Sequence, residues 1–438
     1  MKEINISDKK EEIKKEEPLK QKTEEVKNQP VKEDKKKIKE ESPATKKIEN
    51  LKGIISKKKG IVILSIIILI FILGIEAFYY FGIYKYNPTL KDQDVVDVGS
   101  NYITAEEETV VFAQLLVDSP EEPRTEESPL NGLLFTKSEM EELMTKRFAA
   151  VMISNHSAAR PVSGITSTDL VIESLAESGI TRYIAFFWSE APEKVGSVRS
   201  TRQYFLEWIS PYDPIYIHVG CADTNDPRTD ACDHLFTYNI KDISYIGSWR
   251  WNDGRRYAPH NAYSSVISSW DYAEQQGWDD FPEDFESWQF KNDADTESRG
   301  DAYRYSIKFH TQLSNGGLYD TIWEYDEVTN QYKRWVGGKP DVDQENDEQV
   351  TAKVIVVQEV SMTSAYDNKG RIIIDTIGEG DAVILMDGEE IYGSWEKTDR
   401  MDRTTYYDED ENEIKFNRGR IWIAAIPQSV GEFDIIEQ

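Results

Sequence analysis

Residues Ile61 to Ile83 form an almost unbroken apolar stretch, interrupted by Ser65 and Glu76. About 20 mostly apolar residues in a helix cross a bilayer, and the lysines at 57–59 place the N-terminus in the cytoplasm. A cleaved signal peptide is the competing interpretation. The long charged leader and the lack of a small-x-small cleavage site after Ile75 count against it. We therefore expect an uncleaved signal anchor at 60–84, a single pass through the cell membrane, and an extracytoplasmic chain from about residue 87.

Charge divides the chain at this span. The whole chain has a net charge of −29. Residues 1–60 hold 19 Lys and 13 acidic residues, so the remaining residues 61–438 hold 32 basic and 67 acidic residues. The Lys/Glu-rich tail 1–59 is expected to be disordered in the cytoplasm. It is either a solvated leader or a tether to anionic lipid or a cytoplasmic partner. The acidic outer part argues against nucleic acid as its partner, because phosphate backbones require Lys and Arg.

An acidic linker at 85–128 separates the span from two globular domains. Residues 129–295 alternate strand patterns with helix patterns at 197–209 and 265–275, which predicts a mixed α/β domain. Residues 300–428 carry strand patterns punctuated by Gly and Asn, which predicts a β-rich sheet, sandwich or barrel. The fold class is therefore α+β, preceded by one transmembrane helix. The predicted strands are Ala149–Ile153, Leu170–Ile172, Tyr183–Trp188, Pro214–Val219, Tyr303–Phe309, Tyr319–Tyr325, Gln331–Val336, Lys353–Val360, Arg371–Ile374, Ala382–Met386, Glu390–Trp395, Thr404–Tyr407 and Ile421–Ile426.

Cys221 and Cys232 are the two cysteines of the chain. Outside the cytoplasm, two cysteines that flank a short polar loop favour a disulfide. A metal-binding pair is the alternative, but no CxxC motif is present. The five histidines form no HxxxH or HExxH motif. We therefore expect neither a metal nor a cofactor.

The densest candidate site is the segment Gly196–Arg202, which follows a strand and is predicted to open a helix. Free N–H groups at a helix N-terminus, with Ser197 and with Arg199 and Arg202 on adjacent turns, would form an anion cradle. A parallel next strand would return His218 to the same edge. The alternative is that both arginines pair with surface acids, such as those at 190, 193 and 207.

Two further segments supply candidate ligand-binding residues. The loop after the first strand carries His156 and Arg160, and the segment before the second helix carries His260 and Asn261. Either loop could line a pocket at the strand ends or merely cap and connect elements. His218 and His260 are the candidate catalytic acids or bases. Arg182 is expected at the far end of its strand from the 196–202 segment, because six residues of strand span about 20 Å.

These segments together resemble a known family. The residues that carry the resemblance are Ala149–His156, Ala159–Gly164, Asp169–Val171, Glu177–Arg182, Pro192–Arg202, Tyr257–Asn261, Thr351–Lys353, Gly393–Lys397, Tyr407–Asp410 and Gly419–Ile423. In this order they resemble the YerB-like family of bacterial surface lipoproteins over about residues 129–428. The resemblance implies an envelope-facing protein of two domains, from a family of unknown function without assigned catalytic residues. Family members use a lipidated Cys, whereas this chain has a predicted span.

Three functional hypotheses follow. The first is a non-catalytic envelope protein that binds an anionic wall polymer or a lipid-linked precursor. The second is an envelope enzyme that acts on a phosphorylated or pyrophosphate-linked substrate, with arginines clamping phosphate. The third is a scaffold for a protein partner. The absence of a serine-hydrolase elbow, a Walker loop and a Rossmann fingerprint favours the first.

Overall fold

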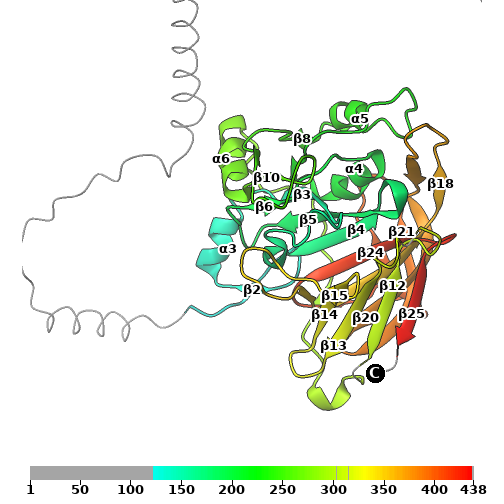
Figure 1. Ribbon diagram of the computed structural model, residues 1–438. Coiled ribbons are helices and arrows are strands. Elements are labelled where there is room, and N and C mark those ends of the chain that lie inside the picture. Colours follow the sequence, from blue (N-terminus) through cyan, green and yellow to red (C-terminus); the bar gives the residue numbers. More distant parts are fainter. Residues whose placement is uncertain (1–121, 302, 314, 437–438) are drawn as a thin grey trace, which may run out of the picture. The chain divides into compact units, whose positions relative to one another are not determined.

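The structure is a computed structural model that describes residues 122–438 except 302, 314, 437 and 438. The predicted tail 1–59 and span 60–84 lie outside the described residues, and so does most of the linker 85–128. Among the described residues, no helix has the length and hydrophobicity needed to cross a bilayer. The described chain is a mixed fold in which strands predominate. Its α-helices are all formed by residues before 300 (Figure 1).

A ten-stranded sheet forms the centre of the described unit. Its strands, in spatial order, are β22 (Thr405–Asp408), β21 (Glu389–Lys397), β20 (Gly378–Met386), β17 (Val354–Val360), β24 (Ile421–Pro427), β4 (Leu170–Leu175), β5 (Thr181–Phe187), β3 (Ala149–Ser154), β7 (Ile215–Ile217) and β8 (Lys241–Asp242). Strand β24 runs parallel to both β17 and β4. The residues before 295 and those after 300 therefore build one continuous sheet, although the sequence assigns them to two domains.

A second sheet packs on one face of the first (Figure 1). Its strands are β15 (Lys339–Pro340), β14 (Gln331–Val336), β13 (Thr321–Asp326), β12 (Arg304–Lys308) and β25 (Glu432–Ile436), with β16 (Thr351–Ala352) paired to β14. Alternate residues of β13 and β14 are buried, as expected for a sheet with one covered face. Trp323 of β13 packs against Trp422 of β24 with 5.3 Å between ring centroids. Arg334 of β14 is fully buried against Glu173 of β4.

Four α-helices and four small sheets are the other main elements of the described residues. The helices are α3 (Lys137–Leu143), α4 (Gln203–Ile209), α5 (Ala231–Thr237) and α6 (Val266–Gln276). In the three-stranded small sheet, β10 (Ala262–Ser264) lies between β6 (Val195–Gly196) and β9 (Trp249–Arg250). The other three small sheets pair β1 (Glu126–Glu127) with β2 (Leu134–Phe135), β11 (Phe290–Lys291) with β23 (Phe416–Asn417), and β18 (Met362–Ser364) with β19 (Ile372–Ile374). Buried aromatic and aliphatic side chains of α4 cover the face of the large sheet opposite the second sheet.

The predicted strands are present within a few residues of their expected bounds. The predicted helix 265–275 is present as α6, shifted by one residue. Ser265 caps this helix, since its hydroxyl oxygen accepts the Ser268 N–H at 3.2 Å. The predicted helix 197–209 is wrong in its first half, since α4 begins only at Gln203. The preceding residues are extended and bond to strand backbones: the Arg199 N–H donates to the Met152 carbonyl at 2.8 Å. Those backbone groups are therefore not free to start a helix.

The direction of β7 also differs from the expected crossover. β7 runs parallel to β3, but β3 is antiparallel to β5, so β7 is antiparallel to β5 and no parallel crossover joins the two. The carboxyl end of β7 therefore lies beside the carboxyl end of β3 and the amino end of β5. The extended segment 197–202 reaches the same edge, because Val198 pairs with Ile153 and Thr201 pairs with Cys221.

Candidate functional site

Two histidine rings lie against each other where β3 ends and β10 begins. His156 follows β3, and His260 ends a turn in which its N–H donates to the Tyr257 carbonyl at 2.7 Å. The ring centroids are 4.1 Å apart and the ring planes are inclined by 26°. Both side chains are partly exposed. The structure thus brings together two candidate residues that the sequence placed on separate loops.

Two arginines from different elements border this pair. Arg199, on the extended segment, donates from Nη1 to the Pro259 carbonyl at 3.4 Å. Arg250, on β9, donates from Nη1 to the Asn261 Oδ1 atom at 3.2 Å. We refer to His156, Arg199, Arg250, His260 and Asn261 as the histidine–arginine cluster. Burial, followed by the positive charge of Arg202 and then that of Arg250, lowers the pKa of Arg199 against the opposing pull of Glu177.

The cluster carries an excess of positive charge. In the described residues, which run from 122 to 436 without 302 and 314, no carboxylate oxygen lies within 4.0 Å of a guanidinium nitrogen of Arg199, Arg250 or Arg160. Arg160 donates instead to the Leu318 carbonyl at 2.7 Å and lies over the ring of Tyr319. Guanidinium groups without a carboxylate partner are suited to bind an anion.

Both imidazoles of the cluster are held neutral at neutral pH. Burial, followed by the charges of Arg199 and Arg160, lowers the pKa of His156. Burial, followed by the neighbouring His156 and Arg199, lowers the pKa of His260 to about 4. The His156 Nδ1 atom accepts the Ala158 N–H at 3.0 Å, so its hydrogen lies on Nε2. The His260 Nδ1 atom is buried and has no hydrogen-bond partner among the described residues.

Arg202 does not belong to an anion cradle, which corrects the sequence-based expectation. Its guanidinium forms a two-point ion pair with Glu177, with 2.8 Å between Nη2 and Oε2. Burial raises the pKa of Glu177, but the hydrogen bond and charge of Arg202 and the charge of Arg182 outweigh it and lower the pKa. Because residues 197–202 are extended, Arg199 and Arg202 do not share one helical face.

Arg182 lies near Arg199, contrary to the expectation from strand length. Its Nη1 donates to the carbonyl of Ser200, and its Nη2 lies 3.4 Å from the Glu177 Oε2 atom. The expectation failed because the chain turns back between β5 and residue 197. The segment 197–202 therefore lies at the amino end of β5, where Arg182 is the second residue of the strand, and not at its carboxyl end.

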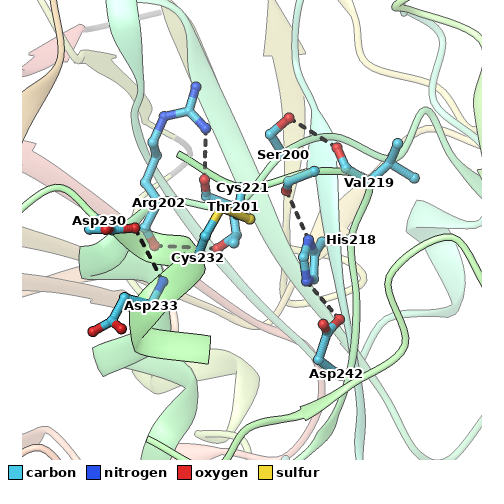
Figure 2. Close-up of a disulfide and its surroundings, with 11 residues drawn as sticks. Ser200, Thr201, Arg202, His218, Val219, Cys221, Asp230, Cys232, Asp233 and Asp242 are labelled. Atoms are coloured by element: carbon cyan, nitrogen blue, oxygen red, sulfur yellow. Dashed lines mark hydrogen bonds and ion pairs between the residues drawn. A yellow bond between two sulfur atoms is a disulfide. The ribbon is translucent and has the colours of Figure 1, made fainter. Parts of the chain in front are cut away.

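His218 is buried directly after β7, and an oxygen atom lies close to each of its ring nitrogens, although only the Nδ1 contact is a hydrogen bond (Figure 2). Nδ1 lies 2.8 Å from the Gly220 carbonyl oxygen, and Nε2 lies 2.7 Å from the Asp242 Oδ1 atom. These contacts suit a residue that holds β7 and β8 together. A parallel crossover would have turned Arg199, Arg202 and His218 towards one ligand. The structure does not arrange the three side chains in this way.

Cys221 and Cys232 form the predicted disulfide, with 5.3 Å between their Cα atoms. The bond joins the end of the β7 segment to the first turn of α5 (Figure 2). Ser197 is fully buried, and its Oγ atom has no hydrogen-bond partner among the described residues. Within those residues, no group of three or more His, Cys, Asp or Glu side chains is arranged to hold a metal ion.

Arg250 was missed by the sequence analysis. It enters the cluster through the pairing of β9 with β10, a two-residue contact that leaves no periodic pattern in the sequence. The adjacent arginines Arg255 and Arg256 are more conspicuous in the sequence, but both form ion pairs with Asp253.

Comparison with known proteins gives a consistent match along the described chain. The model of the N-terminal domain of DUF3048, a protein family of unknown function, matches residues 135–279, and the model of its C-terminal domain matches residues 310–423. A Bacillus subtilis (strain 168) protein named "Putative lipoprotein YerB" is 29% identical over 310 residues, which cover 70% of this chain and 88% of the relative. The crystal structure of YerB from Bacillus subtilis is similar with a TM-score of 0.61 and 28% identity, over 71% of this chain and all of the crystallised chain.

Proposed function

Because this chain belongs to the YerB-like DUF3048 family, whose N- and C-terminal domains it carries in order, we propose that it is an extracytoplasmic binding protein of the bacterial envelope. The proposed ligand is an anion that carries phosphate, and the proposed site is the histidine–arginine cluster. Membrane attachment through the apolar stretch Ile61–Ile83 is part of this proposal. It is supported by the length of that stretch and by the printed name of the Bacillus relative, "Putative lipoprotein YerB", which also suggests attachment to a membrane.

One observation carries the proposal. His156 and His260 stack at 4.1 Å beside Arg199, and no ion pair recorded in the described chain neutralises Arg199 or Arg250. This is unusual for a chain whose residues 61–438 hold 67 acidic and 32 basic residues, since surface carboxylates are abundant. Like charges held together repel each other, and a bound anion would relieve that repulsion while accepting hydrogen bonds from guanidinium and imidazole N–H groups.

The neutral histidines make the proposed binding sensitive to pH. A bound phosphate would favour the charged imidazolium and raise the pKa of each ring. Binding is therefore expected to take up protons and to strengthen as the pH falls from about 7 to 5. The arginines remain charged throughout this range.

The test is a calorimetric titration of the full-length chain, purified in a mild detergent, with inorganic pyrophosphate at pH 6 and low salt. Replacing Arg199→Ala together with Arg250→Ala should weaken binding by at least about 100-fold, since two charged hydrogen bonds together contribute at least about 3 kcal/mol. Arg228→Ala is the matched control, because Arg228 is an exposed arginine already paired with Asp226. Unchanged affinity in the double variant would reject the cluster as the site.

An envelope enzyme acting on a pyrophosphate-linked substrate is the second candidate. The observation that favours it is the position of His260, a partly exposed imidazole stacked on His156 beside Arg199, because a histidine within reach of a bound phosphate can act as a general acid or base. Turnover of a nucleoside diphosphate sugar by the wild-type chain, lost in His260→Ala while pyrophosphate binding persists, would establish this function. No turnover by the wild-type chain would leave the binding function.

A further inference from the structure

An exposed tyrosine stands beside the segment that carries Arg199. Tyr245 lies in the loop after β8, and 64% of its surface is exposed. Its backbone is left-handed, with φ of 65°. This conformation is unfavourable for a large side chain, and residues held in it concentrate at binding sites. The loop thus presents an aromatic ring to solvent at a conformational cost.

The hydroxyl group of Tyr245 lies beside a glycine. At Gly220, a Cβ atom would lie 3.4 Å from the Tyr245 hydroxyl and 2.9 Å from the Ser200 Oγ atom. The φ of Gly220 is +85°, so glycine is favoured both by its backbone and by the space that the two hydroxyls occupy. We refer to Ser200, Gly220 and Tyr245 as the hydroxyl ledge. It adjoins the cluster, because the N–H of Val219, the residue before Gly220, donates to the Arg199 carbonyl at 3.0 Å.

The floor of this ledge is held from several sides (Figure 2). The Ser200 hydroxyl donates to the Val219 carbonyl at 2.9 Å, which leaves its oxygen lone pairs free to accept. Thr201 pairs with Cys221, and the disulfide to Cys232 fixes Cys221 in turn. A surface that is ordered before binding loses little conformational entropy when a ligand arrives.

We propose that the ligand is a glycosyl phosphate, whose phosphate occupies the histidine–arginine cluster and whose sugar lies on the hydroxyl ledge against the ring of Tyr245. The inference rests on the proposed function and adds the sugar to it. Sugar rings offer an apolar C–H face that packs on an aromatic ring, while their hydroxyls bond to polar groups at the edge. The ledge provides one aromatic face and two hydroxyls beside a cationic site, which matches both halves of such a ligand.

Three soluble probes separate the halves of the ligand: glucose 1-phosphate, inorganic phosphate and glucose. With the full-length chain in detergent, calorimetry should give an affinity for glucose 1-phosphate about tenfold above that for phosphate. Tyr245→Ala and Tyr245→Leu should reduce it to within about twofold of phosphate, whereas Tyr245→Phe should retain most of it. Trp249→Ala is the matched control, since Trp249 is an exposed aromatic residue whose ring packs beside Tyr263.

The outcomes distinguish this inference from the proposed function. Equal affinities for phosphate and glucose 1-phosphate, unaffected by either Tyr245 variant, would overturn the sugar site and leave the anion site intact. If the wild-type chain bound neither phosphate nor glucose 1-phosphate, the proposed function itself would be rejected. The proposed site recognises only the phosphate and the sugar, and glucose 1-phosphate carries both without a lipid. Binding of a prenyl-linked sugar phosphate in micelles, without binding of glucose 1-phosphate, would therefore also overturn the assignment.

Discussion

Replacing Arg334 with methionine tests how firmly the two sheets are joined. Arg334 lies on β14 with its side chain fully buried, 2.7 Å from the Glu173 carboxylate of β4, and it also pairs with Asp341. Its guanidinium lies 4.5 Å from the centre of the Trp422 ring. In Arg334→Met, two buried carboxylates lose their cation while the apolar contacts are largely kept.

The expected loss is about 3–5 kcal/mol at pH 7, the range found when one partner of a buried ion pair is removed. All 11 tryptophans of the chain lie between Trp188 and Trp422, so tryptophan fluorescence of the full-length protein reports on the described unit alone. With a urea dependence of about 3 kcal/mol per M, the unfolding midpoint should fall by more than about 1 M.

The reasoning also predicts the pH dependence of this variant. Burial already raises the pKa of Glu173 against the pull of Arg334, and removing the arginine raises it further. The deficit should therefore shrink towards pH 5, where Glu173 can take up a proton. Glu173→Gln added to Arg334→Met should recover part of the loss at pH 7. A loss below about 1 kcal/mol, or two separate unfolding transitions in the wild-type protein, would refute the view of one interlocked unit.

Three further predictions concern single features. Cys221→Ser with Cys232→Ser should lower the stability by about 2–3 kcal/mol by releasing a short loop, and reductant should shift the melting temperature of the wild type towards that of the variant but leave the variant unchanged. Ser265→Ala should cost about 1 kcal/mol by removing the cap of α6, whereas the same change at exposed Ser157 should leave the urea midpoint unaltered. The pKa of His260 is about 4 in the folded protein against 6.5 when unfolded, so its contribution is complete above pH 6.5 and is lost as the pH falls towards 4. His260→Gln should therefore lose less stability than the wild type between pH 7 and 4.5, by about 1 kcal/mol after allowance for solvent screening, and an equal loss in the two proteins would contradict the shifted pKa.

Strand patterns were the most predictable part of this molecule. The strand 331–336 has the predicted bounds, because its buried and half-buried residues alternate as a one-sided strand requires. Strands β17 and β24 differ from prediction by one residue at one end, because buried runs rich in Val and Ile admit few alternatives. What the pattern does not contain is which strands become neighbours. The pairing of β24 with β4 joins residues about 250 apart in the sequence, and no local signal encodes it.

The candidate site was only partly predictable for the same reason. The histidines and Arg199 stood out as chemical groups, but their convergence depends on the extended path of residues 197–202, which has the local composition of a helix start. Arg202 forms an ion pair with Glu177, which lies in the turn before β5, and the sequence gives no sign of this contact. Arg250 and Tyr245 were overlooked because their importance lies in their neighbours and not in their sequence context.

The most direct test of the proposed anion site is a titration of its histidines by NMR. The chain has five histidines, so selective labelling of histidine gives few signals, and His156→Gln and His260→Gln variants assign two of them. Without ligand, His260 should titrate at about pH 4 and His156 below its usual range. Saturating pyrophosphate should raise both values by a unit or more. Histidines of the cluster that titrate identically with and without pyrophosphate, under conditions in which pyrophosphate binds, would contradict the account.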